Sequence, residues 1–387
     1  MERFTSKDLR ELAGITAPHC ISIYMPVYRK GREMQQNPVR LRNLLGQAEE
    51  KLRQAGLRGP KVAALLQPAT DLLPNEFFWQ RQGNGLAMFL SSAGMLHYAT
   101  SRAFAEQVVW GKRYHLVPLL PLVADDAPFF ILSLSLKKIR LIEATRQAAV
   151  EREVPGVPHG IEELEQYVDA EPCLQFHTAT PPAVGPRKRQ AVFHSHGADV
   201  DELGVKTREA EYCHLVAEKV QRVLAEETAP LVLACDKALA GLYRKTNRYA
   251  HLLDAEVEGN PDYLGNEQLR DAAWPLIETM LAERRRQAIQ QYREAEAAGC
   301  GSHQLRDVLL AGLDGRIASL LLADNGRCYG QLDEERREVY VHEQPQAGDE
   351  DLLNCALSLA ARENAALHAI PQEQMPDKAP VAAVFRW

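Results

Sequence analysis

The sequence predicts an α/β protein made of three α/β domains, on three observations. The chain has 387 residues. A single hydrophobic core is usually formed by fewer residues than this, so two or three domains are expected. Strand-like apolar runs alternate with amphipathic helical patterns along the chain, and this alternation is typical of helices packed on sheets. Asp125-Asp126-Ala127-Pro128 has the composition of a linker, and a long helical pattern follows Gly259-Asn260-Pro261. We therefore expect domains over residues 1–124, 125–262 and 263–387.

The first domain is expected to combine a small sheet with two helices. Cys20–Val27 is a continuous apolar run, which predicts a buried strand. From Asn37 the apolar residues recur at helical spacing until Gly56, and a second helix is predicted over Lys61–Leu73. Two strands joined by Ser92-Ala93-Gly94 predict a β-hairpin; they are Gly85–Ser91 and Met95–Ser101.

The middle domain is predicted to be a mixed sheet with helices. Its expected strands are Phe129–Ser135, Ile139–Ala144 and Pro230–Ala234, and its expected helices are Ile161–Val168, Thr207–Glu226 and Ala238–Thr246. Between Cys173 and Lys206 the sequence is the least regular of the chain and is rich in His, Pro and Gly. That stretch predicts a long loop in an otherwise regular domain.

The third domain begins with a long helix and then alternates between short helices and strands. The expected helices are Asn266–Ala298, His303–Leu313 and Asp351–Asn364. The expected strands are Arg316–Ala323, a return strand from Arg327, Val339–His342, Ala366–Ile370 and Val381–Arg386. This order predicts an α/β/α sandwich with helices on a central sheet.

Composition excludes several classes of protein. A net charge of −7 argues against a protein that binds nucleic acid over its whole surface. The seven cysteines form no Cys-x-x-Cys pair, so zinc ribbons and disulfide scaffolds are not indicated. Phosphate-binding loops, dinucleotide fingerprints and serine or zinc hydrolase motifs are missing from the sequence, and we expect no cofactor. No apolar run approaches the length of a membrane span, and the first residues do not resemble a signal peptide, so we expect a cytoplasmic protein without membrane contact.

Three C-terminal stretches resemble one known family. They are DGRIASLLLADNGRCYGQLD (Asp314–Asp333), DEDLLNCALSLAARENAALHAIP (Asp349–Pro371) and APVAAVFRW (Ala379–Trp387). They are similar to the last domain of archaeal and eukaryotic peptide-chain release factors and of Pelota. The rest of the chain resembles a bacterial branch of these factors, through ISIYMP, VRLRNLL, FWQRQGNGLAMFL, LQFHTAT, AVFHSHG and HLLDAEVEGNPDYL.

The resemblance implies a factor that engages ribosomes and tRNA. In the family, a Gly-Gly-Gln loop of the middle domain directs water to the peptidyl-tRNA ester. The loop needs glycines for close approach to RNA and an amide to position the water. This chain contains no Gly-Gly-Gln, and the family's Asn-Ile-Lys-Ser stop-codon reader is also absent. The resemblance therefore implies rescue of stalled ribosomes or quality control, and leaves open whether the chain hydrolyses peptidyl-tRNA.

By the resemblance, the region equivalent to the release loop is residues 175–197. By the resemblance, Gly185 and Gln190 are the candidate catalytic residues of this loop. The basic triplet Arg187, Lys188 and Arg189 is the candidate RNA-binding element, because a cationic loop suits phosphate contacts.

Two other functions stay open on the sequence. His194 and His196 would share one face of a strand, and His177 on a neighbouring strand could add a third imidazole ligand for zinc. A metal-dependent hydrolase is therefore one alternative, although no carboxylate stands at metal-motif spacing. The other alternative is a non-catalytic interaction module that binds a protein partner through its C-terminal domain, favoured by the missing glycines and the acidic net charge.

Overall fold

The computed structural model describes residues 4–29, 31–124, 128–164, 199–324 and 326–387 of the chain. Helices and four sheets make up this part, so the predicted α/β class is confirmed. The chain forms two compact units. One contains Met1–Ala127 and Thr279–Trp387, and the other contains Pro128–Glu278. The division into three domains with boundaries at residues 124 and 262 stays a prediction, because a shared compact unit does not decide whether its parts fold independently.

The N-terminal part contains a four-stranded sheet in the order β3-β2-β1-β4. Every neighbouring pair of strands is antiparallel, and the expected hairpin is β2–β3. The elements are α1 (Ser6–Gly14), β1 (Thr16–Pro26), η1 (Arg32–Gln36), α2 (Asn37–Gln54), α3 (Gly59–Thr70), α4 (Glu76–Gln80), β2 (Gly85–Ser91), β3 (Gly94–Thr100), β4 (Gln107–Arg113), η2 (Val117–Leu119) and α5 (Leu120–Ala124).

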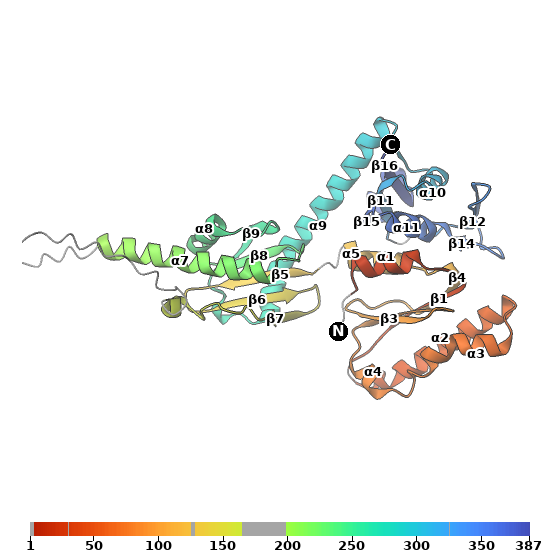
Figure 1. Ribbon diagram of the computed structural model, residues 1–387, viewed down its shortest axis with the longest axis horizontal. Coiled ribbons are helices and arrows are strands. Elements are labelled where there is room, and N and C mark those ends of the chain that lie inside the picture. Colours follow the sequence, from red (N-terminus) through yellow and green to blue (C-terminus); the bar gives the residue numbers. More distant parts are fainter. Residues whose placement is uncertain (1–3, 30, 125–127, 165–198, 325) are drawn as a thin grey trace, which may run out of the picture. The chain divides into compact units, whose positions relative to one another are not determined.

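Side chains of β1 divide between the two faces of this sheet, as the period of a strand requires. Ile21, Ile23 and Met25 pack in one core with α2 and α3. Cys20 and Tyr24 point to the opposite face and pack in a second core with α1 and with C-terminal residues. In Figure 1 the sheet accordingly lies between α1 and the pair α2 and α3.

The C-terminal part is built on a sheet in the order β10-β16-β11-β15. Strand β11 pairs parallel with β15 and antiparallel with β16. A second, three-stranded sheet has the order β13-β12-β14. The elements are α9 (Asn266–Ala297), β10 (Gly301–Ser302), α10 (Leu305–Leu313), β11 (Ile317–Ala323), β12 (Tyr329–Asp333), β13 (Glu338–His342), β14 (Glu350–Asp351), α11 (Leu352–Arg362), β15 (Ala366–Ile370), η5 (Gln372–Gln374), η6 (Pro376–Lys378) and β16 (Val381–Phe385).

Both faces of the β10–β16 sheet are covered by helices. Leu320 and Leu322 pack with α10, α11 and the N-terminal part in one core. Leu321 lies on the other face and packs with Ile289 and Tyr292 of α9. The predicted α/β/α sandwich is therefore confirmed, with α9 as one layer and α10 with α11 as the other.

The second unit holds a five-stranded sheet in the order β7-β6-β5-β8-β9. Strands β5, β8 and β9 run parallel, while β6 and β7 form an antiparallel extension. The elements are β5 (Phe129–Leu134), β6 (Ile139–Ala144), β7 (Ala149–Arg152), η3 (Ile161–Glu163), α7 (Asp199–Val223), β8 (Leu231–Cys235), α8 (Lys237–Thr246), β9 (Leu252–Glu258) and η4 (Pro261–Tyr263). Helices α7 and α8 share one core with this sheet.

Helix α9 has 32 residues and begins in the second unit. Its first turns bury Leu269, Ala273 and Ile277, and the Trp274 ring contacts Phe129 of β5 at 6.1 Å between ring centroids. Within the described residues, neither α9 nor any other helix is both long and apolar enough to cross a membrane.

A buried polar cluster joins the N-terminal sheet to α11 within the first unit. The Asn354 side chain accepts a hydrogen bond from Leu116 N at 2.6 Å and donates one to Tyr114 O at 2.9 Å. Arg113 Nη1 donates to Glu350 Oε2 at 2.9 Å, and its Nη2 pairs with Glu334. These contacts satisfy backbone and charged groups that burial would otherwise leave unpaired.

His115 and Asp351 form the least satisfied part of this cluster. Their facing atoms, Nδ1 and Oδ2, lie 4.0 Å apart, and neither atom has a hydrogen-bond partner in the described part of the chain. Burial, and then the charge of Arg327, lowers the pKa of His115 from 6.5 to about 4. Burial raises the pKa of Asp351, against hydrogen bonds from backbone N–H groups. The environment therefore disfavours the charged form of both side chains.

Candidate functional site

The catalytic, RNA-binding and metal candidates predicted from the sequence all lie in the segment 165–198, outside the described residues. They are Gly185, Arg187, Lys188, Arg189 and Gln190, and the imidazole candidates His177, His194 and His196. Their roles stay predictions. The structure does describe the parts of the second unit that precede and follow this segment.

On the N-terminal side, the chain is fixed to the turn between β5 and β6. Ile161 N donates to Leu136 O at 2.8 Å, and Leu164 is buried in the core with α7. A side chain at Gly160 would place its Cβ 2.8 Å from Lys137 O and 2.9 Å from Leu136 O. Only glycine allows this close approach of two backbones, so the chain before the segment is held directly on the turn.

On the C-terminal side, α7 is fixed to the same turn. Tyr212 is fully buried, and its hydroxyl donates to Ser135 O at 3.1 Å. Burial raises the pKa of Tyr212, so the phenol keeps its proton and acts as a donor. Tyr212 is thirteen residues into α7, and the rise per residue of a helix puts the start of α7 roughly 20 Å further along its axis.

The turn itself is ordered by Ser135. Its Oγ accepts from Lys138 N at 2.9 Å and from Lys137 N at 3.1 Å. Both lysines are exposed, so the turn presents two ammonium groups next to the place where the segment departs. Such groups suit contact with phosphate oxygens. The sequence predicted the two strands on either side of this turn but indicated no role for the turn itself.

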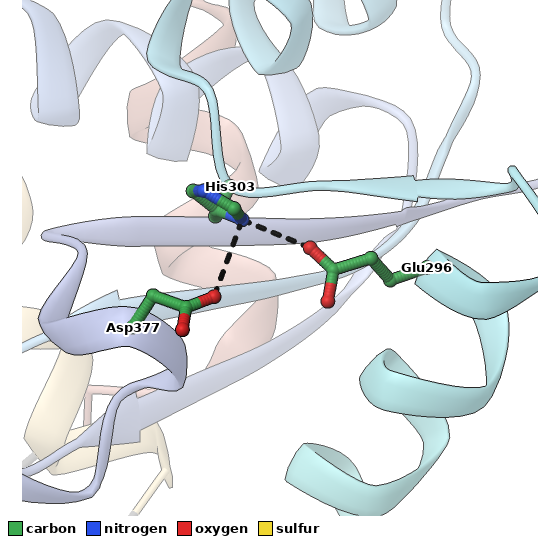
Figure 2. Close-up of side chains that lie close together, drawn as sticks. All are labelled: Glu296, His303 and Asp377. Atoms are coloured by element: carbon green, nitrogen blue, oxygen red, sulfur yellow. Dashed lines mark hydrogen bonds and ion pairs between the residues drawn. The ribbon is translucent and has the colours of Figure 1, made fainter.

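A second candidate site lies in the C-terminal part and was not predicted from the sequence. Glu296, His303 and Asp377 bring one carboxylate, one imidazole and a second carboxylate together (Figure 2). His303 Nδ1 lies 2.9 Å from Glu296 Oε1 and 3.8 Å from Asp377 Oδ2. Asp377 is 74 positions from His303 in the chain, so no spacing motif could reveal this group of three. Among the described residues, this is the group whose donor atoms converge closely enough for one metal ion.

Comparison with known proteins finds a family match over the central part of the chain. Residues 128–316 match the family described as bacterial archaeo-eukaryotic release factor family 3. The matched range contains the second unit and the segment 165–198. This match confirms the resemblance to the bacterial branch that the sequence analysis predicted. A comparison with curated proteins found no match.

Several solved structures are similar over the full length of this chain. An archaeal translation termination factor has 17% identity and a TM-score of 0.26, and the comparison covers 100% of this chain and 99% of that chain. Ribosome-bound archaeal Pelota has 11% identity and a TM-score of 0.42, with coverage of 100% and 95%. Pelota of Archaeoglobus fulgidus has 12% identity and a TM-score of 0.29, with coverage of 100% and 94%. These likenesses are too distant for any residue-by-residue comparison.

Proposed function

Because residues 128–316 of this chain match bacterial archaeo-eukaryotic release factor family 3, we propose that the protein engages ribosomes or tRNA, in the rescue of stalled ribosomes or in translation quality control. The family match carries this proposal, and it includes the whole second unit. The segment 165–198 within that unit is the part that reaches RNA, through Arg187, Lys188 and Arg189.

The frame of the second unit supports this assignment. The chain contacts the β5–β6 turn on both sides of the segment, at Gly160 before it and at Tyr212 of α7 after it. Loops that carry binding or catalytic residues are commonly held by a rigid scaffold of this kind. Lys137 and Lys138 add positive charge at the base of the segment, in a chain whose net charge is −7. Local positive charge in an acidic protein directs RNA to this place rather than to the whole surface.

Ester hydrolysis is part of the proposal only through Gln190 and Gly185. A glutamine amide can position a water and stabilise an oxyanion, while a single glycine supplies one position for close approach to RNA. If the protein binds without hydrolysing the ester, its function would be to recruit another factor to a stalled ribosome.

The charge-reversal variant of Arg187, Lys188 and Arg189, each changed to Glu, is expected to lose association with ribosomes. Three lost phosphate contacts should lower the affinity at least about tenfold and reduce the slope of log affinity against log salt by roughly two to three. The measurement is co-sedimentation of the full chain with stalled ribosome complexes over a range of salt concentrations.

The matched control changes three exposed cations of the N-terminal part, Arg42, Lys51 and Arg58, to Glu. It alters the net charge by the same amount, so equal losses in both variants would contradict a specific role for the loop. Unchanged binding of the loop variant would also contradict it. Capture of a protein partner that survives RNase treatment, without ribosome binding, would favour the interaction module instead.

A further inference from the structure

The cluster of Glu296, His303 and Asp377 is formed by three separate elements of the first unit. Glu296 lies in the last turn of α9, His303 follows β10, and Asp377 lies in η6. Gly299 adopts φ 75°, a left-handed conformation that lets the chain turn back after α9. Strand β10 then pairs with β16, with Gly301 opposite Val384. The reversal places the His303 ring against the helix turn that carries Glu296.

Asp377, the third member of the cluster, lies in a left-handed stretch of backbone. Asp377 has φ 50° and ψ 22°, and Lys378 also has a positive φ of 55°. Aspartate tolerates this left-handed conformation better than most residues, at a cost of about 1 kcal/mol. Met375 anchors the segment in the core beside Tyr292 of α9, and Gln372 Nε2 donates to Lys378 O at 2.8 Å. The conformation directs the Asp377 carboxylate toward His303 (Figure 2).

The buried residue Tyr292 forms hydrogen bonds with the cluster. The Tyr292 side chain is fully buried, and its hydroxyl donates to Glu296 Oε1 at 2.5 Å and lies 3.1 Å from His303 Nδ1. Burial, and then the hydrogen bond to Glu296, raises the pKa of Tyr292, so it remains a donor. The hydrogen bonds from Tyr292 and then His303 lower the pKa of Glu296, so its carboxylate remains charged. Glu296 is thus a fixed anion, and His303 Nδ1 faces its Oε1 at 2.9 Å.

From this geometry we propose that Glu296 Oε1, His303 Nδ1 and Asp377 Oδ2 bind one divalent transition-metal ion. An ion about 2.1 Å from each ligand in a tetrahedral site needs ligand atoms about 3.4 Å apart. The observed separations of 2.9 Å and 3.8 Å from His303 Nδ1 lie on either side of that value. All three donor atoms lie within 4.8 Å of one another, so small side-chain rotations complete the site.

The donor set selects the class of ion. One imidazole with two carboxylates suits Zn²⁺, Mn²⁺, Fe²⁺ or Co²⁺, whereas Mg²⁺ and Ca²⁺ prefer oxygen donors alone. The Asp377 side chain is 71% exposed, which leaves water as the fourth ligand. The side-chain amide of Gln304 lies 3.4 Å from His303 Nε2. With the amide oxygen turned to the ring it would accept the Nε2–H, the second hydrogen bond that orients most histidine ligands.

The ion would connect the end of α9 to η6 and to the segment after β10, three elements of one compact unit. This role is separate from RNA binding, because none of its ligands lies in the segment 165–198. It is also separate from the metal site predicted from His177, His194 and His196.

Titration of the metal-free full chain with Zn²⁺ tests the proposal, with Co²⁺ as a spectroscopic probe. The expected result is one ion per chain with visible Co²⁺ absorption bands. His303→Ala and Asp377→Asn should each weaken binding at least about a hundredfold. Tyr292→Phe should weaken it by about ten- to a hundredfold, as a residue that positions a ligand.

His342→Ala is the matched control, because His342 Nδ1 pairs with Asp349 at 2.9 Å but forms no group of three in the described chain. This variant should bind the ion like the parent. The proposal is overturned if the parent binds no ion, or if His303→Ala retains the parent's affinity. Loss of binding only in a His177, His194 and His196 triple alanine variant would also overturn it.

Discussion

Replacing Asn354 by alanine is expected to lower the free energy of unfolding of the first unit by about 3 kcal/mol. The side chain satisfies two buried backbone groups, Leu116 N and Tyr114 O. Alanine would leave both without a partner, and each unsatisfied buried group costs about 1–3 kcal/mol. The expected loss is measured as faster amide hydrogen exchange in peptides covering 107–123 and 352–362, since two units need not unfold in one transition.

Asn75→Ala provides the control for this substitution. Asn75 caps α4 at the surface by accepting from Phe78 N at 3.0 Å, so the same chemical change should cost only about 1 kcal/mol. Asn75→Ala should increase amide hydrogen exchange only within the N-terminal part. Asn354→Ala should increase it both in the N-terminal part and in α11. A change confined to α11 would contradict a role for Asn354 in holding the two parts of the unit together.

Acidification is expected to destabilise the first unit through His115. The pKa of His115 is about 4 in the fold against 6.5 without burial, so the unfolded chain binds more protons between these values. Stability should therefore fall as the pH drops from 6.5 to 4, by about 1.4 kcal/mol per pH unit and about 3 kcal/mol in total. Below pH 4 the loss from this group should stop.

The His115→Leu variant isolates this effect. The raised pKa of Asp351 acts in the opposite direction, because the folded state then holds a proton more tightly and gains stability as the pH falls. Asp351 is present in both proteins, so the difference between their unfolding free energies reports His115. That difference should shift in favour of the variant below pH 6.5, and curves that stay parallel from pH 7 to 4 would contradict the account.

The sequence predicted the central strands because they form continuous apolar runs. Strand β2 is buried at every position and was predicted with its observed bounds, as were the inner strand β6 and the edge strand β15. Edge strands β4, β7 and β9 were missed, because their side chains are largely half-buried or exposed and give no apolar run. Pairing with a neighbouring strand, rather than a local pattern, defines these three strands.

The contacts between distant parts of the chain could not be predicted from local patterns. Asn354 lies 238 positions from Leu116, and only the shared core of the N- and C-terminal parts brings them together. The Glu296–His303–Asp377 cluster likewise depends on the turn at Gly299 and on the left-handed backbone of Asp377. The release-loop region at residues 175–197 and the roles of Arg187 and Gln190 stay predictions from the family resemblance.

The most direct test of the central claim is peptidyl-tRNA release from stalled ribosome complexes, with binding measured by sedimentation in the same sample. We expect the full chain to co-sediment with the stalled ribosomes. Release that is lost in Gln190→Ala would show a hydrolytic rescue factor, and binding without release would show a factor that recruits others. Absence of binding to ribosomes and to tRNA would contradict the proposed function.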